Sequence, residues 1–465
     1  MKRDIKKLIA YENDKIIDVI EIINKNELKH AFIVDKDEKL LGIVSDGDIR
    51  RAILNNFSLT LPVKDIMIKN PLIAKSGVSE SDILNILIEN KILIIPILDD
   101  KKRVIGYYHI TDFIKEEFLR NTIKKEYDSK KTNRILVTGG TGYIGSILVR
   151  ILLENNYSVR VLDKLLFGKE SVDDLMVNPN FELIQGDFTK IEDLIQSLKD
   201  VSVVIHLAAI VGDPAGNVNP ELTEETNFHG VKILAEFCKY YGIKKFIFLS
   251  TCSVYGASKN KILDEESELN PVSLYAKSKL KAEKALIQLK NNNFYPCILR
   301  LATVFGLSFR MRFDLVVNLL TAYAVNNKEI SIYSGEQWRP FIHVKDVCYA
   351  ILSILKAPNN IISGEIFNVA NEKINYQIKD LGNLMNTIFP DIKVNYVKTK
   401  EDERSYRVTS KKLREKINFI PKYDLEDGVK EIAHFLKNNY IDVKDKRYSN
   451  YKNVHFGVFD SIYFI

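Results

Sequence analysis

Residues 134–163, RILVTGGTGYIGSILVRILLENNYSVRVLD, decide the fold that we expect for most of this chain. A short apolar run leads into three glycines spaced as GxxGxxG, then into a helical pattern and a second apolar run that ends at Asp163. In such a unit Gly139 permits the tight turn, Gly142 lets the backbone approach a pyrophosphate, and Gly145 lets helix and strand pack closely. Free N–H groups at the helix start hold the phosphates. The stretch therefore predicts a doubly wound parallel α/β sheet that binds a dinucleotide.

The acid that closes the second strand indicates which dinucleotide is bound. Asp163 would accept hydrogen bonds from the adenosine ribose, and its charge would repel a 2′-phosphate, so NAD is favoured over NADP. Two later stretches, IQGDF and SVVIHLAA, supply further strand ends near the cofactor. Asp187, in the first of them, could instead only cap its loop. The cofactor-binding residues predicted from these patterns are Gly139, Gly142, Tyr143, Ile144, Gly145, Asp163, Asp187, Phe188, Leu207 and Ala208.

The segment SLYAKSK, 273–279, places Tyr275 four residues before Lys279. Eight other tyrosines also have a lysine four residues on, so the spacing alone does not mark a catalytic pair. The context does differ, because Thr251 ends a buried strand 24 residues before Tyr275, and a helix would put Tyr275 and Lys279 on one face. A free tyrosine has a pKa near 10, and a nearby ammonium lowers it. The three residues therefore suit proton transfer coupled to hydride transfer.

The motifs TGGTGYIG, HLAA, STCSVYG, YAKSK, RPFIHVKDV and FNVAN follow one another along residues 133–437. In this order they resemble the extended short-chain dehydrogenase/reductase family, the NAD-dependent epimerases and dehydratases of nucleotide sugars. The resemblance implies a Rossmann-type sheet with a smaller C-terminal substrate-binding part, NAD as cofactor and a nucleotide-diphosphate sugar as substrate. It also implies that Thr251, Tyr275 and Lys279 are catalytic. Asn227 then matches the helix asparagine that supports the site. Asn227, Tyr275 and Lys279 are expected to contact the cofactor as well, and Lys279 would hold the nicotinamide ribose.

Two departures from the family pattern restrict the reaction. Sugar 4,6-dehydratases carry Asp-Glu directly after the catalytic threonine, whereas this chain has Cys252 and Ser253, so dehydration is disfavoured. The family's RxxN asparagine is replaced by Thr303, which leaves one diphosphate contact open. An arginine fork suits a diphosphate, although Arg339 could also form only a surface ion pair. The substrate-side residues that the resemblance implies are Asn318 and Arg339, with Arg404 and Arg407 as weaker candidates.

The front of the chain repeats itself. Residues 18–50 and 82–114 align without gaps at an offset of 64, and Asp48 falls on Asp112. Each copy reads as a helix, two short strands around a turn and another helix. Two copies predict a small α/β module that buries a face neither copy could bury alone.

The GIVSDGDIRR segment of the first copy resembles a CBS motif, and residues 1–122 resemble a CBS pair with repeats of about 1–60 and 61–122. That resemblance implies an adenine nucleotide bound by Ser45 and Asp48 in one copy. In the other copy Asp112 is kept, but His109 takes the Ser/Thr place. Alternatively, these residues only cap helices and the module only dimerises the chain.

Length, charge and cysteines set the expected organisation. A chain of 465 residues favours two or three domains. We expect a polar linker at 123–132, a dinucleotide-binding domain at 133–440 with its substrate part mainly after 300, and a polar tail at 441–465. The net charge of +6 comes without a basic stripe, which argues against nucleic acid. Four scattered cysteines, with no metal-ligand cluster, favour a reduced cytoplasm, and the lack of an apolar run of about 18 residues argues against a membrane span.

The leading hypothesis is an NAD-dependent nucleotide-sugar 4-epimerase that acts as a homodimer. Tyr275 would remove the C4-hydroxyl proton while NAD takes the C4 hydride, and the keto sugar would turn over before the hydride returns. One alternative is a net oxidoreductase that reduces a 4-keto sugar or oxidises a hydroxyl. Another is a non-catalytic sensor of NAD and adenine nucleotide, which intact Thr251, Tyr275 and Lys279 disfavour. A mixed hypothesis is an active enzyme that adenine nucleotide regulates through the CBS pair.

Overall fold

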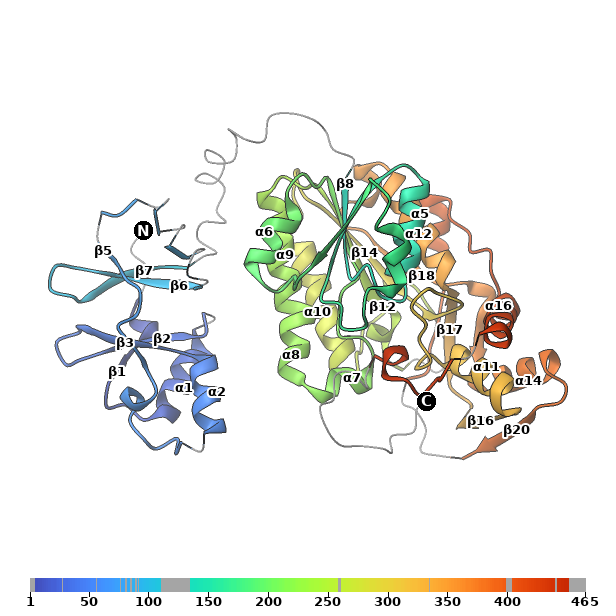
Figure 1. Ribbon diagram of the computed structural model, residues 1–465, viewed down its shortest axis with the longest axis horizontal. Helices are drawn as coiled ribbons and strands as arrows, with labels where there is room; N and C mark the ends of the chain where they lie inside the picture. The colour runs from blue at the N-terminus through green and yellow to red at the C-terminus, as the bar shows by residue number, and fades with distance from the viewer. Residues whose placement is uncertain are drawn as a thin grey trace. The chain divides into compact units, whose positions relative to one another are not determined.

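The computed structural model describes residues 5–109 and 134–450, apart from 27, 56, 76, 80–81, 84–85, 88–89, 91, 258–260, 334, 399–403 and 440. The chain divides into two compact units, Met1–Asp128 and Ser129–Ile465, which we describe one at a time (Figure 1). The predicted linker at 123–132, the tail beyond 450 and Asp112 lie outside the described residues.

In unit 1 the sequence repeat is also a structural repeat. β2 pairs antiparallel with β3, and His30 lies opposite Ser45. β6 pairs antiparallel with β7, and Ile94 lies opposite His109, which is the same register displaced by 64 residues. The elements are η1 (Ile5–Leu8), β1 (Ile9–Tyr11), α1 (Ile16–Lys25), β2 (His30–Val34), β3 (Leu40–Ser45), α2 (Asp46–Leu54), η2 (Val63–Asp65), β4 (Ile68–Lys69), β5 (Ala74–Lys75), β6 (Ile94–Leu98) and β7 (Val104–His109).

The two repeats of unit 1 share a core. Val19, Ile33 and Val44 belong to a buried cluster within the first repeat. Phe32 of the first repeat packs with Ile94 and Leu98 of the second in another buried cluster. Each repeat thus presents an apolar face that the other covers, as expected for stacked copies of one supersecondary unit.

Unit 2 is built on one parallel sheet with the strand order β10-β9-β8-β11-β12-β14-β18. Its pairings are all parallel. The chain starts at β8 inside the sheet and winds outward in both directions, which is the Rossmann-type doubly wound arrangement and confirms the predicted fold class. The strands are β8 (Arg134–Thr138), β9 (Ser158–Asp163), β10 (Phe181–Gln185), β11 (Val203–His206), β12 (Lys245–Thr251), β14 (Tyr295–Leu301) and β18 (Ile366–Val369).

Helices cover both faces of this sheet. α5 and α12 pack together on one face, and α6, α9 and α10 lie on the other (Figure 1). Strands buried on both faces need continuous apolar runs, and β12 is buried at every position after Lys245. Among the described helices, none has the length and apolar character to cross a membrane. The covering helices are α5 (Gly145–Glu154), η4 (Glu170–Leu175), α6 (Ile191–Leu198), α7 (Asp213–Val218), α8 (Pro220–Glu224), η5 (Glu225–Gly230), α9 (Val231–Tyr240), η6 (Cys252–Tyr255), α10 (Leu274–Leu289), α12 (Val344–Lys356) and α13 (Asn359–Ile362).

The C-terminal part carries three small sheets and its own apolar cluster, in which Phe305, Phe341, Leu381 and Val429 are buried. It is not one continuous segment, because the chain returns to the main sheet with α12 and β18. Its elements are β13 (Ile262–Leu263), β15 (Thr303–Phe305), α11 (Val316–Asn327), β16 (Glu329–Tyr333), β17 (Trp338–His343), η7 (Glu372–Ile374), β19 (Asn375–Gln377), α14 (Ile378–Ile388), β20 (Lys393–Val397), β21 (Arg407–Val408), α15 (Lys411–Ile417), α16 (Leu425–Asn438) and η8 (Lys446–Tyr448).

Residues 441–450, which the sequence marks only as polar, pack onto unit 2. Tyr448 packs against an apolar cluster that contains Phe313, and the centres of these two rings are 5.7 Å apart. The Phe313 N–H donates to the Tyr448 carbonyl at 2.9 Å. This segment, which we call the tail strap, is therefore fixed to the loop that precedes α11.

Candidate active site

The glycine-rich turn between β8 and α5 forms a cradle with no room for a side chain at Gly139, Gly140 or Gly145. Gly139 has φ of +75°, and a Cβ there would lie 2.8 Å from the Ala208 nitrogen. A Cβ on Gly145 would lie 2.3 Å from the Gly139 carbonyl oxygen. Gly140, which the sequence analysis did not single out, is equally confined, since its Cβ would lie 2.5 Å from Val161 Cγ2. The bare backbone at the start of α5 fits the phosphates of a dinucleotide.

This turn borders a cleft of about 2160 Å³ between the main sheet and the C-terminal part. A pocket for one drug-sized ligand is at most about 1,000 Å³, so the cleft has room for a dinucleotide and a second ligand. The predicted site residues that line it are Gly139, Gly142, Tyr143, Ile144, Gly145, Asp163, Phe188, Leu207, Ala208, Thr251, Tyr275, Lys279 and Arg404.

Asp163 lies at the carboxyl end of β9, and the backbone fixes its carboxylate. Oδ2 accepts a hydrogen bond from the Thr141 N–H at 3.1 Å, and Oδ1 accepts one from the Leu165 N–H at 2.9 Å. The side chain is half-buried and lines the cleft beside the glycine turn. A carboxylate held there suits the hydroxyls of an adenosine ribose.

Thr251, Tyr275 and Lys279 meet at the same cleft. Ser273 caps α10 by accepting from the Ala276 N–H at 3.2 Å, which starts the helix one residue before Tyr275. Lys279 follows one turn later, where burial lowers the pKa of its ammonium to about 7. Thr251 ends β12, and its Oγ1 accepts from the Ser253 N–H at 3.1 Å.

A buried ion pair fixes α10 against the sheet below these residues. Glu283, one turn after Lys279, pairs with Arg300 of β14 at 2.8 Å, and both side chains are fully buried. Ser250 of β12 also donates to Glu283. Because removal of one partner would leave a buried charge unpaired, the pair holds α10 in one position relative to β12.

Two predicted cofactor residues do not line the cleft. Asp187 accepts from the Thr189 N–H at 3.0 Å and pairs with Lys164 at 2.7 Å, so it caps its loop. Asn227 is fully buried, and its amide exchanges two hydrogen bonds of 2.9 Å with the Ile210 backbone. It therefore supports the segment after β11 from behind. It lies on the π-helical turn η5, a distortion frequent at functional sites.

Two predicted substrate residues also point elsewhere. Asn318 is fully buried, where it accepts from the Gly306 N–H at 3.1 Å and donates to the Arg312 carbonyl at 3.0 Å. Arg339 donates to the backbone carbonyl of Arg404, a residue that lines the cleft. Both are absent from the residues that line the cleft in the described chain, so they position neighbours that do line it. Arg407 stacks on Trp338 instead, with 4.8 Å between guanidinium carbon and ring centre.

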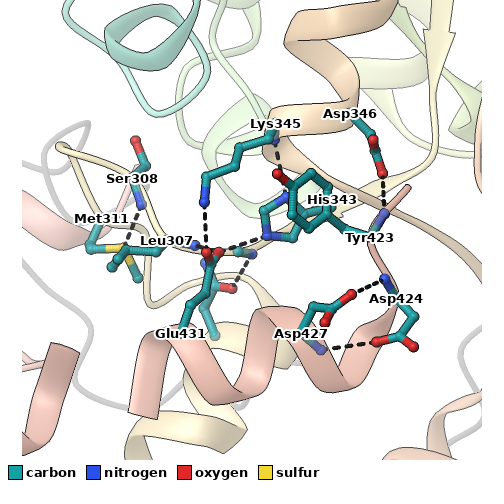
Figure 2. A network of polar contacts seen from close by, with 12 residues as sticks. Leu307, Ser308, Met311, His343, Lys345, Asp346, Tyr423, Asp424, Asp427 and Glu431 are labelled. Atoms are coloured by element: carbon teal, nitrogen blue, oxygen red, sulfur yellow. Dashed lines mark hydrogen bonds and ion pairs between the residues drawn. The ribbon is translucent and has the colours of Figure 1, made fainter. Parts of the chain in front are cut away.

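The loop at 306–314, which we call the arginine loop, is anchored by a partly buried polar network (Figure 2). The Leu307 N–H donates to Glu431 Oε1 at 2.6 Å, and His343 Nε2 lies 2.6 Å from the same oxygen. Lys345 pairs with Glu431 at 2.9 Å. His343 Nδ1 accepts from the Lys345 N–H at 3.2 Å, which leaves Nε2 as the donor to Glu431. Hydrogen bonds to Glu431, a residue of α16 that also contacts His343 of β17, thus hold the arginine loop in place.

Sequence reasoning missed further residues that line the cleft. Arg312 and Asp314 form a bidentate pair at 3.0 and 2.8 Å in the arginine loop. Tyr406 is buried at the cleft, with its hydroxyl 3.3 Å from Ser253 Oγ, directly beside the Thr251 strand end. The alternating FRMRFD sequence, 309–314, was a usable signal for the loop, but Tyr406 carried none, because its neighbour Ser253 is 153 residues away.

In unit 1, the predicted nucleotide ligands contact each other. Asp48 Oδ2 accepts from the Ser45 hydroxyl at 2.6 Å and from the Ser45 N–H at 2.8 Å. The other carboxylate oxygen pairs with Arg51. The two residues thus cap the start of α2, which leaves the capping hypothesis in place beside nucleotide binding.

Comparison with known families matches both units. The model described as "NAD dependent epimerase/dehydratase family" matches residues 135–370. The CBS domain model matches twice, at 1–55 and 63–118.

Individual proteins agree on the family and differ in reaction. A protein of Methanocaldococcus jannaschii, provisionally named as a UDP-glucose 4-epimerase, is 31% identical over 66% of this chain and 99% of its own length. Human dTDP-D-glucose 4,6-dehydratase is 27% identical over 69% of this chain and 92% of its own.

Solved structures show the same division. UDP-glucuronic acid 4-epimerase from Bacillus cereus, in complex with UDP-glucuronic acid and NAD, matches with a TM-score of 0.59 at 29% identity, over 66% of this chain and 99% of that one. dTDP-glucose 4,6-dehydratase from Bacillus anthracis, in complex with NAD, matches with a TM-score of 0.59 at 26% identity, over 66% of this chain and 97% of that one.

Proposed function

The chain belongs to the NAD dependent epimerase/dehydratase family, and we propose that it is a nucleotide-sugar 4-epimerase with NAD as its cofactor. The observation that carries the proposal is the meeting of Thr251, Tyr275 and Lys279 in one cleft with the glycine turn. The relatives that are named as epimerases of UDP-sugars support a nucleotide sugar as the class of substrate. The base and the sugar of the substrate are left to experiment.

Tyr275, Lys279 and Thr251 have separate roles in the proton transfer. When it is bound by the glycine cradle and Asp163, NAD would accept the hydride from the sugar C4 carbon and later return it, so no cofactor would be consumed. Tyr275 takes the proton from the sugar C4 hydroxyl and gives it back to the keto oxygen. The positive charge of Lys279, one helical turn away, favours the phenolate form of Tyr275 through which this proton transfer passes. Thr251 shares a hydrogen bond with the same sugar oxygen.

Dehydration is disfavoured by the residues that follow Thr251. Cys252 is fully buried, its thiol lies 3.3 Å from the Arg300 carbonyl, and burial raises its pKa, so it is a packing residue. Ser253 does line the cleft, but a hydroxyl cannot replace a carboxylic acid as proton donor. The carboxylates among the described residues of the cleft are Asp163, Asp314 and Glu329. Asp314 is paired with Arg312, and Glu329 with Lys393.

The CBS pair of unit 1 adds a regulatory proposal. We expect an adenine nucleotide to bind near Ser45 and Asp48 and to change the rate of the enzyme. Supporting this is the exact 64-residue structural repeat, which places the two strand ends at equivalent positions. We also expect a cytoplasmic homodimer. The four cysteines are buried and free, which suits a reducing compartment.

The deciding experiment offers the purified protein, without added cofactor, a panel of UDP-, GDP-, CDP- and dTDP-sugars and reads the products by NMR. Wild type should convert one of them to its C4 epimer, and Tyr275→Phe should lose at least about a hundredfold in rate. Turnover only after NAD or NADPH is supplied with a keto sugar or an acceptor would make the protein a net oxidoreductase. A 4-keto-6-deoxy product would make it a dehydratase. Bound NAD with no turnover would favour a sensor.

A further inference from the structure

Arg310, in the arginine loop, is a buried cation with an incomplete set of partners. Its side chain is 6% exposed and lines the cleft. Nη1 donates to Asn450 Oδ1 of the tail strap at 2.8 Å. Nε and Nη2, both buried, have no hydrogen-bond partner among the described residues. Buried N–H groups are normally paired, so these two donors suit an acceptor that a bound ligand supplies.

The acceptor that fits these two donors is an anion that takes two parallel hydrogen bonds. Nε and Nη2 form one edge of the guanidinium, and Arg312 uses the same edge to bind both carboxylate oxygens of Asp314. Such a fork matches a carboxylate or a phosphate. One flat face of Arg310 is already covered, since its guanidinium carbon lies 3.7 Å from the Phe167 ring centre. Burial and the neighbouring charge of Arg312 lower the pKa of Arg310 to about 9, so it is still a cation at neutral pH.

The arginine loop crosses the start of α5, where a dinucleotide places its phosphates. Ser308 donates to the Tyr143 carbonyl at 2.6 Å, and the Tyr143 hydroxyl donates to the Gly306 carbonyl at 2.7 Å. Tyr143 is itself part of the glycine turn. The Arg310 charge also interacts with that of Asp163, the predicted ribose ligand. The Nε–Nη2 edge of Arg310 therefore lies near the junction of the predicted ribose and phosphate sites.

We propose that the Nε–Nη2 edge of Arg310 binds the pyrophosphate of NAD, and that the tail strap holds Arg310 in place through Asn450. The inference rests on NAD as the cofactor in the proposed function. The strap is tied to the arginine loop twice more, through the Phe313–Tyr448 backbone bond and through the Asn450 N–H, which lies 3.4 Å from Asp314 Oδ2. The C-terminal segment thus becomes part of the cofactor site.

The test measures ligand binding rather than turnover. The full chain, stripped of nucleotide, is titrated by calorimetry with ADP-ribose, which contains the pyrophosphate. Binding of adenosine, which lacks the pyrophosphate, is followed by ligand-observed NMR. Arg310→Gln should weaken ADP-ribose about 10- to 100-fold and leave adenosine unchanged. Arg310→Lys keeps the charge but cannot donate two parallel hydrogen bonds, so its affinity for ADP-ribose should lie between those of wild type and Arg310→Gln. The matched control is Arg447→Gln, an exposed arginine of the same strap that pairs with Asp445.

Stability without ligand separates this role from a structural one. Arg310 is a buried cation that lacks a charged partner within the described part of the chain, so its removal should leave the melting temperature of the ligand-free protein unchanged or raise it. Asn450→Ala should weaken ADP-ribose binding without loss of the fold. Unchanged ADP-ribose affinity in Arg310→Gln would overturn the proposal, as would a loss confined to NADP, which would assign the edge to a 2′-phosphate. If wild type binds neither NAD nor ADP-ribose, the proposed function fails together with this inference.

Discussion

The Lys279 ammonium donates a hydrogen bond of 2.8 Å to the carbonyl oxygen of Leu249, and so joins α10 to β12. Leu249 lies two residues before Thr251, and Tyr275 lies one turn before Lys279. This bond therefore sets the position of the proposed acid–base residue relative to the strand end. The same ammonium lies 4.5 Å from the Phe248 ring centre, a cation–π contact inside the core.

The first prediction concerns Lys279 and pH. Its folded pKa of about 7 lies below the value near 10.4 of an unfolded lysine. Between these values the unfolded chain binds more protons, so stability must rise with pH. We expect the melting temperature of wild type, relative to Lys279→Met, to increase from pH 7 to pH 10. Lys281→Met, which alters an exposed lysine of the same helix, should show a constant difference; a constant difference for Lys279→Met would contradict the lowered pKa.

The second prediction separates the roles of two glycines. A Cβ on Gly145 meets backbone atoms of Gly139 and Gly140 at 2.3 and 2.6 Å, so the turn must open. Gly145→Ala should cost about 1–3 kcal/mol of stability and lose NAD binding. A Cβ on Gly142 meets only the Gly139 carbonyl, at 3.3 Å. Gly142→Ala should therefore weaken NAD with little loss of stability, as measured by thermal unfolding with and without NAD. Equal stability of the two variants would refute the steric assignment.

The glycine turn and the front repeat were predictable because their signals are local. A GxxGxxG turn between apolar runs specifies its own geometry, and a 64-residue offset specifies equivalent registers. Gly140 was missed because its constraint comes from Val161 on the neighbouring strand. Such a contact exists only after β8 and β9 have paired.

The substrate side was less predictable, because family positions do not fix side-chain direction. Asn318 matches the family position, but its amide satisfies the backbone of the arginine loop behind the cleft. Arg310 meets Asn450 across 140 residues, a contact that no local pattern announces. Long-range packing decides both cases.

The third prediction tests the hydroxyl of Thr251. Thr251→Ser keeps the hydroxyl and should retain most activity. Thr251→Val keeps the branched shape but loses the hydroxyl, and should lower kcat about a hundredfold with NAD affinity unchanged. Because Oγ1 also caps η6, the valine variant should lose about 1 kcal/mol of stability. Full activity in Thr251→Val would remove this residue from the proposed mechanism.

The fourth prediction tests the CBS pair. AMP or ATP should raise the melting temperature of wild type, and Asp48→Ala should abolish the shift. The loss of a helix cap needs its own control. Asp82 makes the same kind of reciprocal contact with Ser79, at 2.6 and 3.2 Å, and is not one of the predicted nucleotide ligands. Asp82→Ala should keep the response. If no adenine nucleotide shifts wild type, the module has a structural role only.

The last prediction concerns Glu431, which anchors the arginine loop. Burial alone would raise the pKa of its carboxyl, but hydrogen bonds from His343, Leu307 and Lys345 hold it below the usual value. A group with a lowered folded pKa contributes stability that is present above its unfolded pKa, near 4.3, and is lost as the pH falls through the folded value. Glu431→Gln should therefore cost about 1–3 kcal/mol at pH 7 and less at pH 3 to 4.

Denaturant unfolding of both proteins across this pH range measures that difference, with Glu426→Gln as the control. Glu426 lies on the same helix and pairs only with exposed Lys430 among the described residues, so its loss should change little at any pH. The anchoring role adds a second readout. Because Glu431 holds the Leu307 N–H three residues before Arg310, Glu431→Gln should also weaken ADP-ribose, in proportion to the loosening of the loop. A stability loss without any change in ADP-ribose affinity would mean that the network supports the fold but does not position Arg310.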